Sequence, residues 1–290
     1  MSEEYIISEL KRRQLCTSIG SIQSLSGGCI STAQRYSTDT GDFFVKTNSD
    51  PKAEQWFLAE SLALERMHEA VPGFVPRPLF YYGQSDHPAF IVTEFMRLST
   101  AEKRLPDMQR QLGRSLAHLH SHQAPQYGFP VTSFCGTTQL DNTPNSNWSD
   151  FFRHQRLQPL LDAVAGQNPD LDRLGQSIVG RLDHLLADIL SEPCLLHGDL
   201  WNGNWAVRGH QAVIFDPASY YGHHEAEFGI MKMFGGFTSD CFDAYYDVAG
   251  CDEPEEERLR LYEMYHHLNH FSMFGEGYDT SCVSLMESLL

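Results

Sequence analysis

One stretch of the chain constrains its fold and chemistry most: His197-Gly198-Asp199-Leu200-Trp201-Asn202-Gly203-Asn204. It lies between two short apolar runs, residues 194–196 and 212–215, of the kind that form buried strands. Asp199 and Asn204 are five positions apart, which is enough for a loop to double back and bring both side chains together. A polar loop between apolar strands therefore predicts a functional site here, rather than a solvated surface turn.

A second carboxylate returns to this loop, because residues 205–215 have the pattern of a hairpin that ends at Asp216. Asp199 can accept the proton of a substrate hydroxyl, while Asn204 and Asp216 offer oxygen ligands to a hard cation such as Mg²⁺. The spacing H-x-D-x-x-x-x-N with a downstream aspartate resembles the catalytic loop and metal ligand of protein-kinase-like enzymes, which use ATP. We therefore expect Asp199 to be the catalytic base, and Asn204 and Asp216 to bind the metal.

Composition excludes several other classes of protein. The length of 290 residues suits one large domain or two lobes, and the net charge of −17 disfavours nucleic acid or an anionic membrane surface as a partner. No apolar run approaches the roughly 20 residues of a membrane span, and the first residues are unlike a signal peptide. The seven cysteines are scattered without a disulfide or zinc pattern, so we expect a reducing, cytoplasmic location.

The N-terminal part of the chain predicts a nucleotide site. Gly27 and Gly28 separate two strand-like runs and would let backbone amides approach phosphates, although most Gly-Gly pairs are ordinary hairpin turns. Lys46 lies on a predicted strand, and Glu60 falls within the apolar stripe of a predicted helix over 52–70. A carboxylate on a buried face needs a partner. We therefore predict a Lys46–Glu60 ion pair in which Lys46 reaches the α and β phosphates.

The pattern changes from strands to helices after the apolar strand at 89–96. We therefore expect one lobe over 1–97, with adenine against the backbone of residues 94–96 (Glu94, Phe95 and Met96), and a second lobe over 98–290. Helices are predicted near 107–122, 147–152, 171–190, 239–249 and 255–272. Two histidine groups share helical spacing, and we interpret them as structural or surface residues rather than metal ligands: His118 and His122, and His266, His267 and His270.

Several motifs together resemble the fructosamine kinase (ketosamine-3-kinase) family, within the aminoglycoside phosphotransferase and choline kinase-like group. The Gly-Asp-Leu-Trp-x-Gly-Asn form of the central loop, joined to Asp-Pro-Ala-x-Tyr-Tyr-Gly-His at 216–223, is specific to this branch. Further matches are Ser26-Gly27-Gly28-Cys29-Ile30-Ser31, Phe44-Val45-Lys46, Phe57-Leu58-Ala59-Glu60 and Phe234-Gly235-Gly236-Phe237.

The resemblance implies an α+β, two-lobed protein-kinase-like fold. Its N-lobe would be an antiparallel sheet with one main helix, its C-lobe larger and mostly helical, and ATP and Mg²⁺ would bind between the lobes. Family members phosphorylate the 3-hydroxyl of ketosamines, which are ribulosamine, erythrulosamine or fructosamine adducts on lysine or free amines, and this leads to deglycation.

The same resemblance assigns roles residue by residue. Asp199 would be the base, Asn204 and Asp216 the metal ligands, Lys46 and Glu60 the nucleotide pair, and Gly27, Gly28, Cys29, Ile30 and Ser31 the cover of the phosphates. Substrate contacts would come from Trp201, His197, Tyr221 and Glu227. Trp201 could instead pack structurally, and Glu227 stands where many relatives have Asp.

Three alternatives stay open. The Cys29 thiol, on a phosphate-covering loop, could form a redox-linked homodimer, whereas the chain could equally be a monomer. The substrate could be an aminoglycoside, choline or another amino alcohol instead of a ketosamine. The chain could also be a non-catalytic, nucleotide-binding kinase-like protein, although every chemical group that catalysis needs is present.

Overall fold

The computed structural model describes residues 2–25, 31–84, 87–187, 189, 192–275 and 277–290. The chain divides into two compact units, unit 1 (Met1–Leu98) and unit 2 (Ser99–Leu290). The sequence pattern changes one residue earlier, after Arg97.

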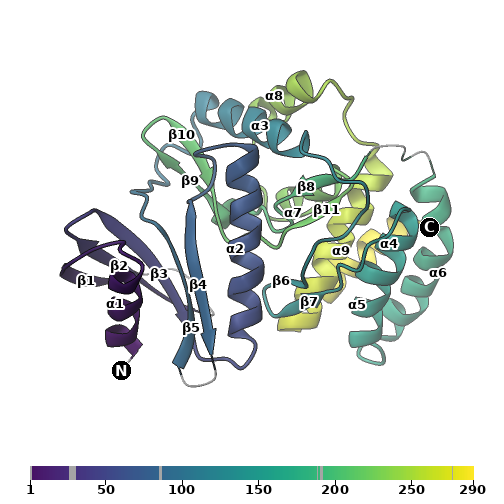
Figure 1. Ribbon diagram of the computed structural model, residues 1–290. Coiled ribbons are helices and arrows are strands. Elements are labelled where there is room, and N and C mark those ends of the chain that lie inside the picture. The colour runs from purple at the N-terminus through teal and green to yellow at the C-terminus, as the bar shows by residue number, and fades with distance from the viewer. Residues whose placement is uncertain (1, 26–30, 85–86, 188, 190–191, 276) are drawn as a thin grey trace. The chain divides into compact units, whose positions relative to one another are not determined.

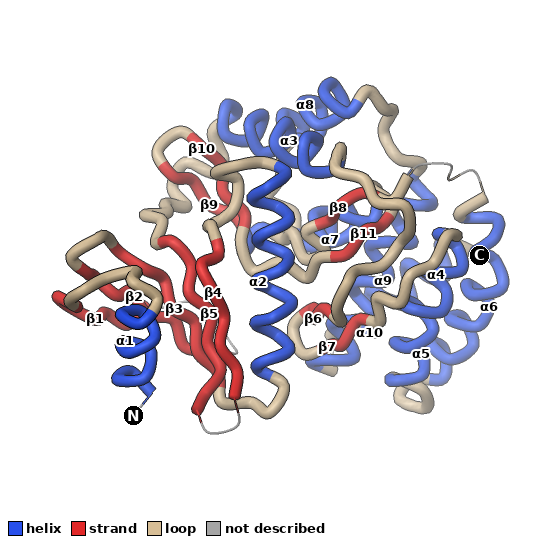
Figure 2. The backbone as a smooth tube through the Cα atoms, viewed as in Figure 1, coloured by secondary structure: helices blue, strands red, loops and turns tan. Residues whose placement is uncertain are grey.

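Unit 1 is built on one antiparallel sheet with strand order β1-β2-β3-β5-β4. Figure 2 shows these strands beside the two helices of the unit, and α2 packs on β4 and β5 (Figures 1 and 2). The elements in chain order are α1 (Ser2–Arg12), β1 (Ile19–Leu25), β2 (Thr32–Thr38), β3 (Asp42–Asn48), α2 (Ala53–Ala70), β4 (Pro78–Gln84) and β5 (His87–Glu94).

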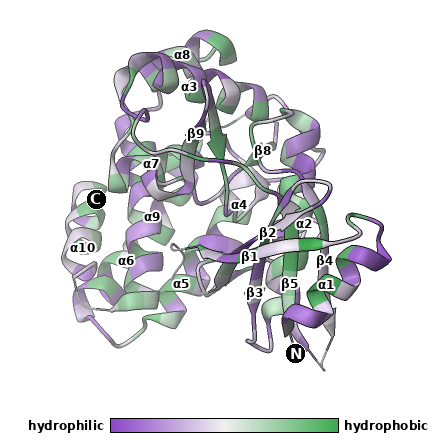
Figure 3. Ribbon diagram, turned by 90° about the vertical axis from the view of Figure 1, so that its left-hand side faces the viewer, coloured by the Kyte–Doolittle hydropathy of each residue, from purple (hydrophilic) through white to green (hydrophobic). Residues whose placement is uncertain are grey.

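Strand β5 carries a continuous apolar run because both faces of the sheet are covered there. Phe90 and Val92 join a buried cluster with Ile6 and Leu10 of α1. Because side chains alternate along a strand, Ile91 points to the opposite face, and α2 contacts β5 as well. The run stands out as hydrophobic in Figure 3. An unbroken apolar strand therefore marks the middle of the unit.

In its described residues, unit 2 is mostly helical and contains three short antiparallel pairs, β6–β7, β9–β10 and β8–β11. Helix α3 packs on α8, and α7 packs on α9. Its helices are α3 (Pro106–His120), α4 (Trp148–Phe152), the π-helix η1 (Arg153–Leu157), α5 (Gln158–Ala163), α6 (Pro169–Leu185), the 3₁₀ turn η2 (Asn202–Asn204), α7 (Ala226–Phe234), α8 (Ser239–Ala249), α9 (Glu256–Phe274) and α10 (Asp279–Ser288). Its strands are β6 (Ser133–Cys135), β7 (Thr138–Leu140), β8 (Cys194–Leu196), β9 (Trp205–Arg208), β10 (Gln211–Ile214) and β11 (Tyr220–Gly222).

Local chemistry explains several boundaries. Asn147 caps α4, since its side chain accepts a hydrogen bond from the Asp150 N–H at 2.9 Å. Helix α1 ends at Arg12, and Gln14 adopts the left-handed φ of 59° typical of a helix end. Among the described residues, none of the helices combines the length and apolar composition needed to cross a bilayer.

Candidate active site

The loop between β8 and η2 depends on a glycine at its turn. Gly198 has a φ of +82°, and a Cβ atom at this position would lie 2.3 Å from the carbonyl oxygen of Ala218. Any larger residue would therefore be strained by its φ and blocked by backbone at the same time. The glycine lets the chain turn between the buried strand β8 and Asp199.

The structure brings Asp199, Asn204 and Asp216 together. The Asn204 Nδ2 donates to the backbone carbonyl of Asp199 at 2.9 Å and to its Oδ2 at 3.2 Å. The N–H of Phe215 donates to the Asn204 carbonyl at 3.0 Å, which places the next residue, Asp216, beside the loop. Asp216 itself has a φ of 57°, so the chain turns sharply there.

The electrostatics of this group suit a cation. Burial, together with the nearby negative charges of Asp216 and Glu227, raises the pKa of Asp199 to about 8. The Asn204 amide has its nitrogen engaged by Asp199, so its oxygen remains as a potential ligand beside the Asp216 carboxylate. Amide and carboxylate oxygens are the ligands that Mg²⁺ takes, and these residues therefore fit such an ion.

His197 fixes the base relative to Asp216. Its ring is fully buried, its Nδ1 accepts the Asp199 N–H at 3.2 Å, and its Nε2 lies 2.9 Å from the Phe215 carbonyl oxygen. These partners assign the proton to Nε2, and burial lowers the pKa of His197, so the ring is neutral. The His197 side chain thus links the backbone at Asp199 to the backbone at Phe215, the residue before Asp216.

Glu227 on α7 secures the start of the same loop. It is only 1% exposed, and its carboxylate accepts the backbone N–H groups of His197 at 2.6 Å and Gly198 at 3.0 Å. Burial raises the pKa of Glu227, but the neighbouring His120, the His197 ring and the loop N–H together leave it below its usual value. The His120 Nε2 lies 3.5 Å from the carboxylate, and its Nδ1 lies 2.8 Å from the Tyr245 hydroxyl.

The structure gives two of the expected substrate residues a clear structural part. His197 and Glu227 are both buried, and both are hydrogen-bonded to backbone of the site. These bonds hold the loop, and a contact of either residue with substrate stays a prediction. Two other expected substrate residues keep exposed surface. Trp201 is 39% exposed, and Tyr221 in β11 is half-buried, with its backbone paired to that of Gly128.

In unit 1 the predicted Lys46–Glu60 pair is present. The Lys46 Nζ on β3 lies 3.0 Å from Oε2 and 3.2 Å from Oε1 of Glu60 on α2. Ser31 Oγ accepts a hydrogen bond from Asn48 at 3.2 Å. Gly27, Gly28, Cys29 and Ile30 lie outside the described residues, so the structure says nothing of the expected phosphate loop or of Cys29.

Comparison with known proteins decides the family. The family model described as fructosamine kinase matches residues 3–290. The chain belongs to the fructosamine kinase family. It is 37% identical to a chloroplastic protein-ribulosamine 3-kinase of Arabidopsis thaliana, over 99% of this chain and 86% of the relative. It is 34% identical to a ketosamine-3-kinase of Mus musculus, over 97% and 98% of the two chains.

Solved structures agree on the fold of this fructosamine kinase family member. A putative fructosamine-3-kinase from Thermobifida fusca superposes with a TM-score of 0.84 at 28% identity, over 97% of this chain and 98% of that one. Aminoglycoside phosphotransferase APH(4)-Ia, in complex with AMP-PNP and hygromycin B, shares the fold alone, with a TM-score of 0.67 at 15% identity over 99% and 97%. The α+β protein-kinase-like fold is thus confirmed, and the chain is an ATP-dependent kinase.

Three supports of the site in this kinase were missed from the sequence. Lys103 is buried, donates to the Asn202 carbonyl, and lies 4.6 Å from the centre of the Trp205 ring, and burial lowers its pKa to about 8. Gln109 is fully buried and donates to the carbonyls of Lys103 and Gly236. Its position on the apolar face of α3 is the one signal that could have revealed it.

The third support is Cys135, whose thiol contacts the Asp199 carboxylate and accepts a hydrogen bond from the Asn269 Nδ2 at 3.3 Å. Burial raises the pKa of this thiol well above its usual value, so it remains protonated and can donate to the base. No spacing in the sequence pairs Cys135 with Asp199, because the contact joins distant elements.

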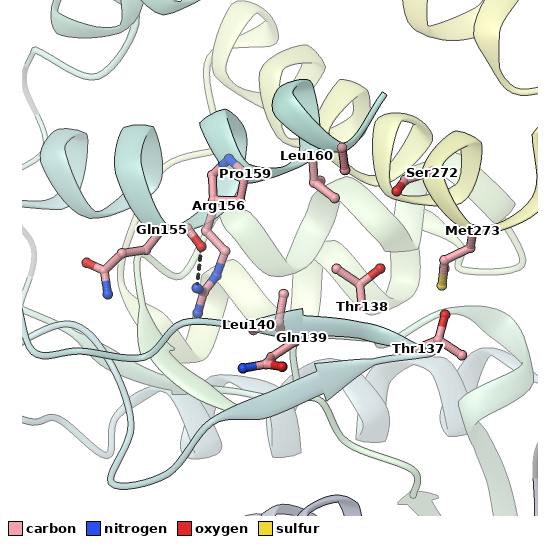
Figure 4. A pocket seen from close by; sticks show the side chains of 11 residues that line it. Thr137, Thr138, Gln139, Leu140, Gln155, Arg156, Pro159, Leu160, Ser272 and Met273 are labelled. Atoms are coloured by element: carbon pink, nitrogen blue, oxygen red, sulfur yellow. Dashed lines mark hydrogen bonds between the residues drawn. The ribbon is translucent and has the colours of Figure 1, made fainter. Parts of the chain in front are cut away.

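The cavities of unit 2 include two that are lined by described residues. One of about 410 Å³ borders the catalytic loop and is lined by Thr100, Ala101, Lys103, Arg104, Asn202, Gly203 and Gly236. The other, of about 290 Å³, lies between the β6–β7 hairpin, η1, α5 and the end of α9 (Figure 4). There the buried Arg156 side chain donates to the Asp141 and Gln155 carbonyls and to Asn142, which anchors the 141–142 backbone beside the cavity.

A cluster of His223, His224 and Glu225 has metal-like spacing but is already engaged. The Glu225 carboxylate takes two hydrogen bonds from Arg258, at 2.7 and 2.9 Å. The Tyr262 hydroxyl accepts the Trp148 N–H at 2.8 Å and lies 2.9 Å from the Nδ1 of His223, to which it can donate. The cluster therefore stabilises the fold and does not resemble a metal site.

Proposed function

We propose that this chain is a ketosamine 3-kinase, which transfers the γ-phosphoryl group of ATP to the 3-hydroxyl of a sugar joined to an amine by glycation. The phosphorylated adduct would then eliminate and release the amine. The observation that carries the proposal is the convergence of Asp199, Asn204 and Asp216 in a chain matched throughout by fructosamine kinases. The relatives named ribulosamine and ketosamine 3-kinases favour ketosamines over aminoglycosides or choline.

In unit 2, Asp199 orients the substrate hydroxyl and accepts its proton as transfer proceeds. Bound Mg²⁺ would neutralise charge on the β and γ phosphates, and the Asn204 oxygen and Asp216 carboxylate would bind it. The hydrogen bond from Asn204 to Asp199 fixes the position of the base relative to the metal ligand. Trp201 and Tyr221 are the proposed substrate contacts, and the Trp201 ring offers an apolar face to the sugar or a π face to its amine.

In unit 1, Lys46 would bind the α and β phosphates while Glu60 holds its ammonium in place. Residues 27–31 would cover the phosphates. For the adenine, the N–H of Phe95 is already donated to the Asp42 carbonyl at 3.2 Å, whereas the Met96 backbone makes no hydrogen bond within the described residues. Met96 is therefore the best candidate of residues 94–96 for a backbone contact.

The test is ADP release with Mg-ATP on ribulose-lysine, fructose-lysine, an aminoglycoside and choline. We expect turnover on the ketosamines, with ribulose-lysine first. Asp199→Asn should lower kcat by about 10³-fold or more with the affinity for ATP nearly kept, because only proton acceptance is lost. Asp247→Asn, an exposed aspartate of α8, is the matched control.

Turnover only on the aminoglycoside or choline would support another small-molecule kinase. ATP binding without turnover on any of the four would instead support the non-catalytic alternative. An Asp199→Asn enzyme as active as the control would remove Asp199 as the base.

A further inference from the structure

The cavity of about 410 Å³ beside the catalytic loop is lined by two cations and by no carboxylate. It borders the loop at Asn202 and Gly203, and its positive charges come from Lys103 and Arg104. None of the described residues that line it is acidic, although the chain holds 38 acidic and only 21 basic residues. We call this hollow the basic cavity.

The Lys103 ammonium group is buried without a counter-charge. The residue is 8% exposed, and its Nζ donates to the Asn202 carbonyl and lies 4.6 Å from the centre of the Trp205 ring. Within the described residues the Nζ makes no other hydrogen bond and no ion pair. A carbonyl and a ring face attract an ammonium but do not neutralise it, and burial lowers the pKa of Lys103 to about 8. An ammonium has three donors, so Lys103 retains both charge and donors for a ligand.

Arg104 provides a second group of donors in the same cavity. Its side chain is exposed and makes no hydrogen bond or ion pair within the part of the chain that the structure describes. A guanidinium presents paired N–H donors that match the oxygens of a carboxylate or a phosphate. The side-chain amide of Asn202 is exposed there as well and can donate alongside. Two cations and an amide are therefore available to one oxyanion.

The buried Gln109 holds two sides of the basic cavity in place. Its Nε2 donates to the carbonyls of Lys103 at 2.7 Å and of Gly236 at 3.2 Å, and both of these residues line the cavity. Its Oε1 accepts the Thr238 N–H at 3.0 Å. One side chain thus fixes the backbone on either side. A cavity that is already formed loses little conformational entropy on binding, which is typical of ligand sites.

The place of the basic cavity limits which oxyanion it can receive. Asn202 lies three residues after Asp199, so their Cα atoms are at most roughly 11 Å apart. An anionic group on the substrate can therefore reach the cavity while the sugar hydroxyl lies at the base. A ketosamine carries such a group in two cases: the carboxylate of a free glycated amino acid, or a phosphate on the sugar. Within a polypeptide the same carboxyl group is a neutral amide.

We infer that the basic cavity is an oxyanion subsite, in which Lys103 and Arg104 bind the carboxylate of a free glycated amino acid or a phosphate on its sugar. The inference rests on the proposed function. The bound anion supplies the counter-charge that Lys103 lacks within the described residues, so an anionic ketosamine binds more tightly than its neutral counterpart. The cavity thus selects among ketosamines by charge.

The experiment compares kcat/KM on three substrates. The first is Nα-acetyl-lysine that carries ribulose on its ε-amine, and the second is its carboxamide, which differs only in the charge at the carboxyl group. The third is the same carboxamide glycated with ribose 5-phosphate. The enzymes are the wild type, Arg104→Gln, Lys103→Met and Arg114→Gln. Arg114, an exposed arginine of α3 that does not line the basic cavity, is the matched control.

We expect the wild type to favour an anionic substrate over the neutral one by roughly tenfold in kcat/KM, through a lower KM. The carboxylate and the phosphate substrates show which oxyanion the cavity takes. Arg104→Gln should reduce the preference and Lys103→Met should abolish it, whereas Arg114→Gln should keep it. A disturbed catalytic loop would lower kcat on all three substrates equally, so the ratio reports on recognition of the charge. If Lys103→Met does not fold, Arg104→Gln decides, because Arg104 is exposed.

Three results would contradict these expectations. A wild type that turns over none of the three substrates refutes the proposed function itself. A wild type with equal kcat/KM on all three, or a preference that Arg104→Gln leaves unchanged, overturns the inference and leaves the proposed function standing. A higher KM for ATP in Arg104→Gln, with the preference among substrates kept, would show that the cavity binds a phosphate of the nucleotide, and this too would overturn the inference.

Discussion

The two units position their functional groups in different ways. In unit 1, Lys46 pairs with the carboxylate of Glu60, and both side chains keep some exposure, 19% for Lys46 and 13% for Glu60. In unit 2, the loop that carries Asp199 is held through its backbone by Glu227, which is 1% exposed, and by the uncharged ring of His197. The first is an ion pair between two side chains, whereas the second is a buried network directed at the main chain.

This difference predicts different consequences of substitution. A partly exposed ion pair contributes at most about 1 kcal/mol to stability, because water solvates both partners well after it breaks. A buried carboxylate that accepts two backbone N–H groups cannot be removed without leaving those donors unpaired in a low-dielectric interior. Unit 1 should therefore lose nucleotide affinity when its pair is broken, whereas unit 2 should lose loop geometry and stability together.

Among the residues that support the two functional groups, the largest effect is expected for Glu227→Gln. The amide has the shape of the carboxylate, but its nitrogen would face one of the two N–H groups of His197 and Gly198 that Glu227 now accepts. We expect kcat to fall about 100-fold, since a shift of about 1 Å in the base has this cost. The free energy of unfolding should also fall, by about 2–3 kcal/mol. Steady-state kinetics and urea unfolding measure the two quantities.

Glu225→Gln is the control that separates geometry from stability. Glu225 is 6% exposed and pairs with Arg258, and among the described contacts it makes none with the catalytic loop. Its loss should destabilise the unit with kcat kept. If both variants lower kcat equally, Glu227 acts only by stabilising unit 2, and the contrast between the units is weaker than we argue. Partial recovery of kcat in Glu227→Asp would support positioning.

The second effect concerns unit 1. Glu60→Gln should raise the KM for ATP about tenfold with a small change in kcat, because Lys46 loses the charge that fixes its ammonium near the phosphates. The free energy of unfolding should change by less than about 1 kcal/mol. Glu65→Gln, an exposed carboxylate on the same helix, is the control. A loss in kcat without any change in KM would contradict the assigned role of Lys46.

The same contrast explains what the sequence could predict. Helical periodicity places Glu60 among buried positions of α2, and the five-residue spacing of Asp199 and Asn204 predicts their contact, since both signals are local. The strand and helix pattern likewise predicts the sheet of unit 1 and the catalytic hairpin. These features depend on neighbours within one or two elements.

Periodicity and short-range spacing could not predict the contacts between distant elements. Glu227 reaches the loop across 30 positions, and Cys135 contacts Asp199 from another hairpin. Gln109 bonds to Gly236 across 127 positions. The family resemblance drew attention to Glu227 as a substrate contact and not to its bonds with the loop, because nothing in a sequence distinguishes a buried carboxylate bonded to backbone from one in a pocket.

The smallest effect tests whether unit 2 keeps His224, whose carbonyl accepts the Glu227 N–H, uncharged in the folded state. Burial, with smaller contributions from the neighbouring His120 and Arg258, lowers the pKa of His224 to about 4, against about 6.5 in an unfolded chain. As the pH falls below 6.5, the unfolded state therefore binds a proton at His224, whereas the folded state binds this proton only near pH 4. The contribution of His224 to the free energy of unfolding is complete above pH 6.5 and is lost between pH 6.5 and 4, with a slope of at most about 1.4 kcal/mol per pH unit.

His224→Gln removes this titration. Urea unfolding at pH 7.5, 6.0 and 5.0 should show a smaller loss of stability between pH 6.0 and 5.0 in the variant than in the wild type, by about 1 kcal/mol. His118→Gln, an exposed histidine of α3, should keep the wild-type slope. Parallel slopes for all three proteins would mean that the folded state accepts a charge at His224, and that the network around Glu227 tolerates charge as readily as the ion pair of unit 1.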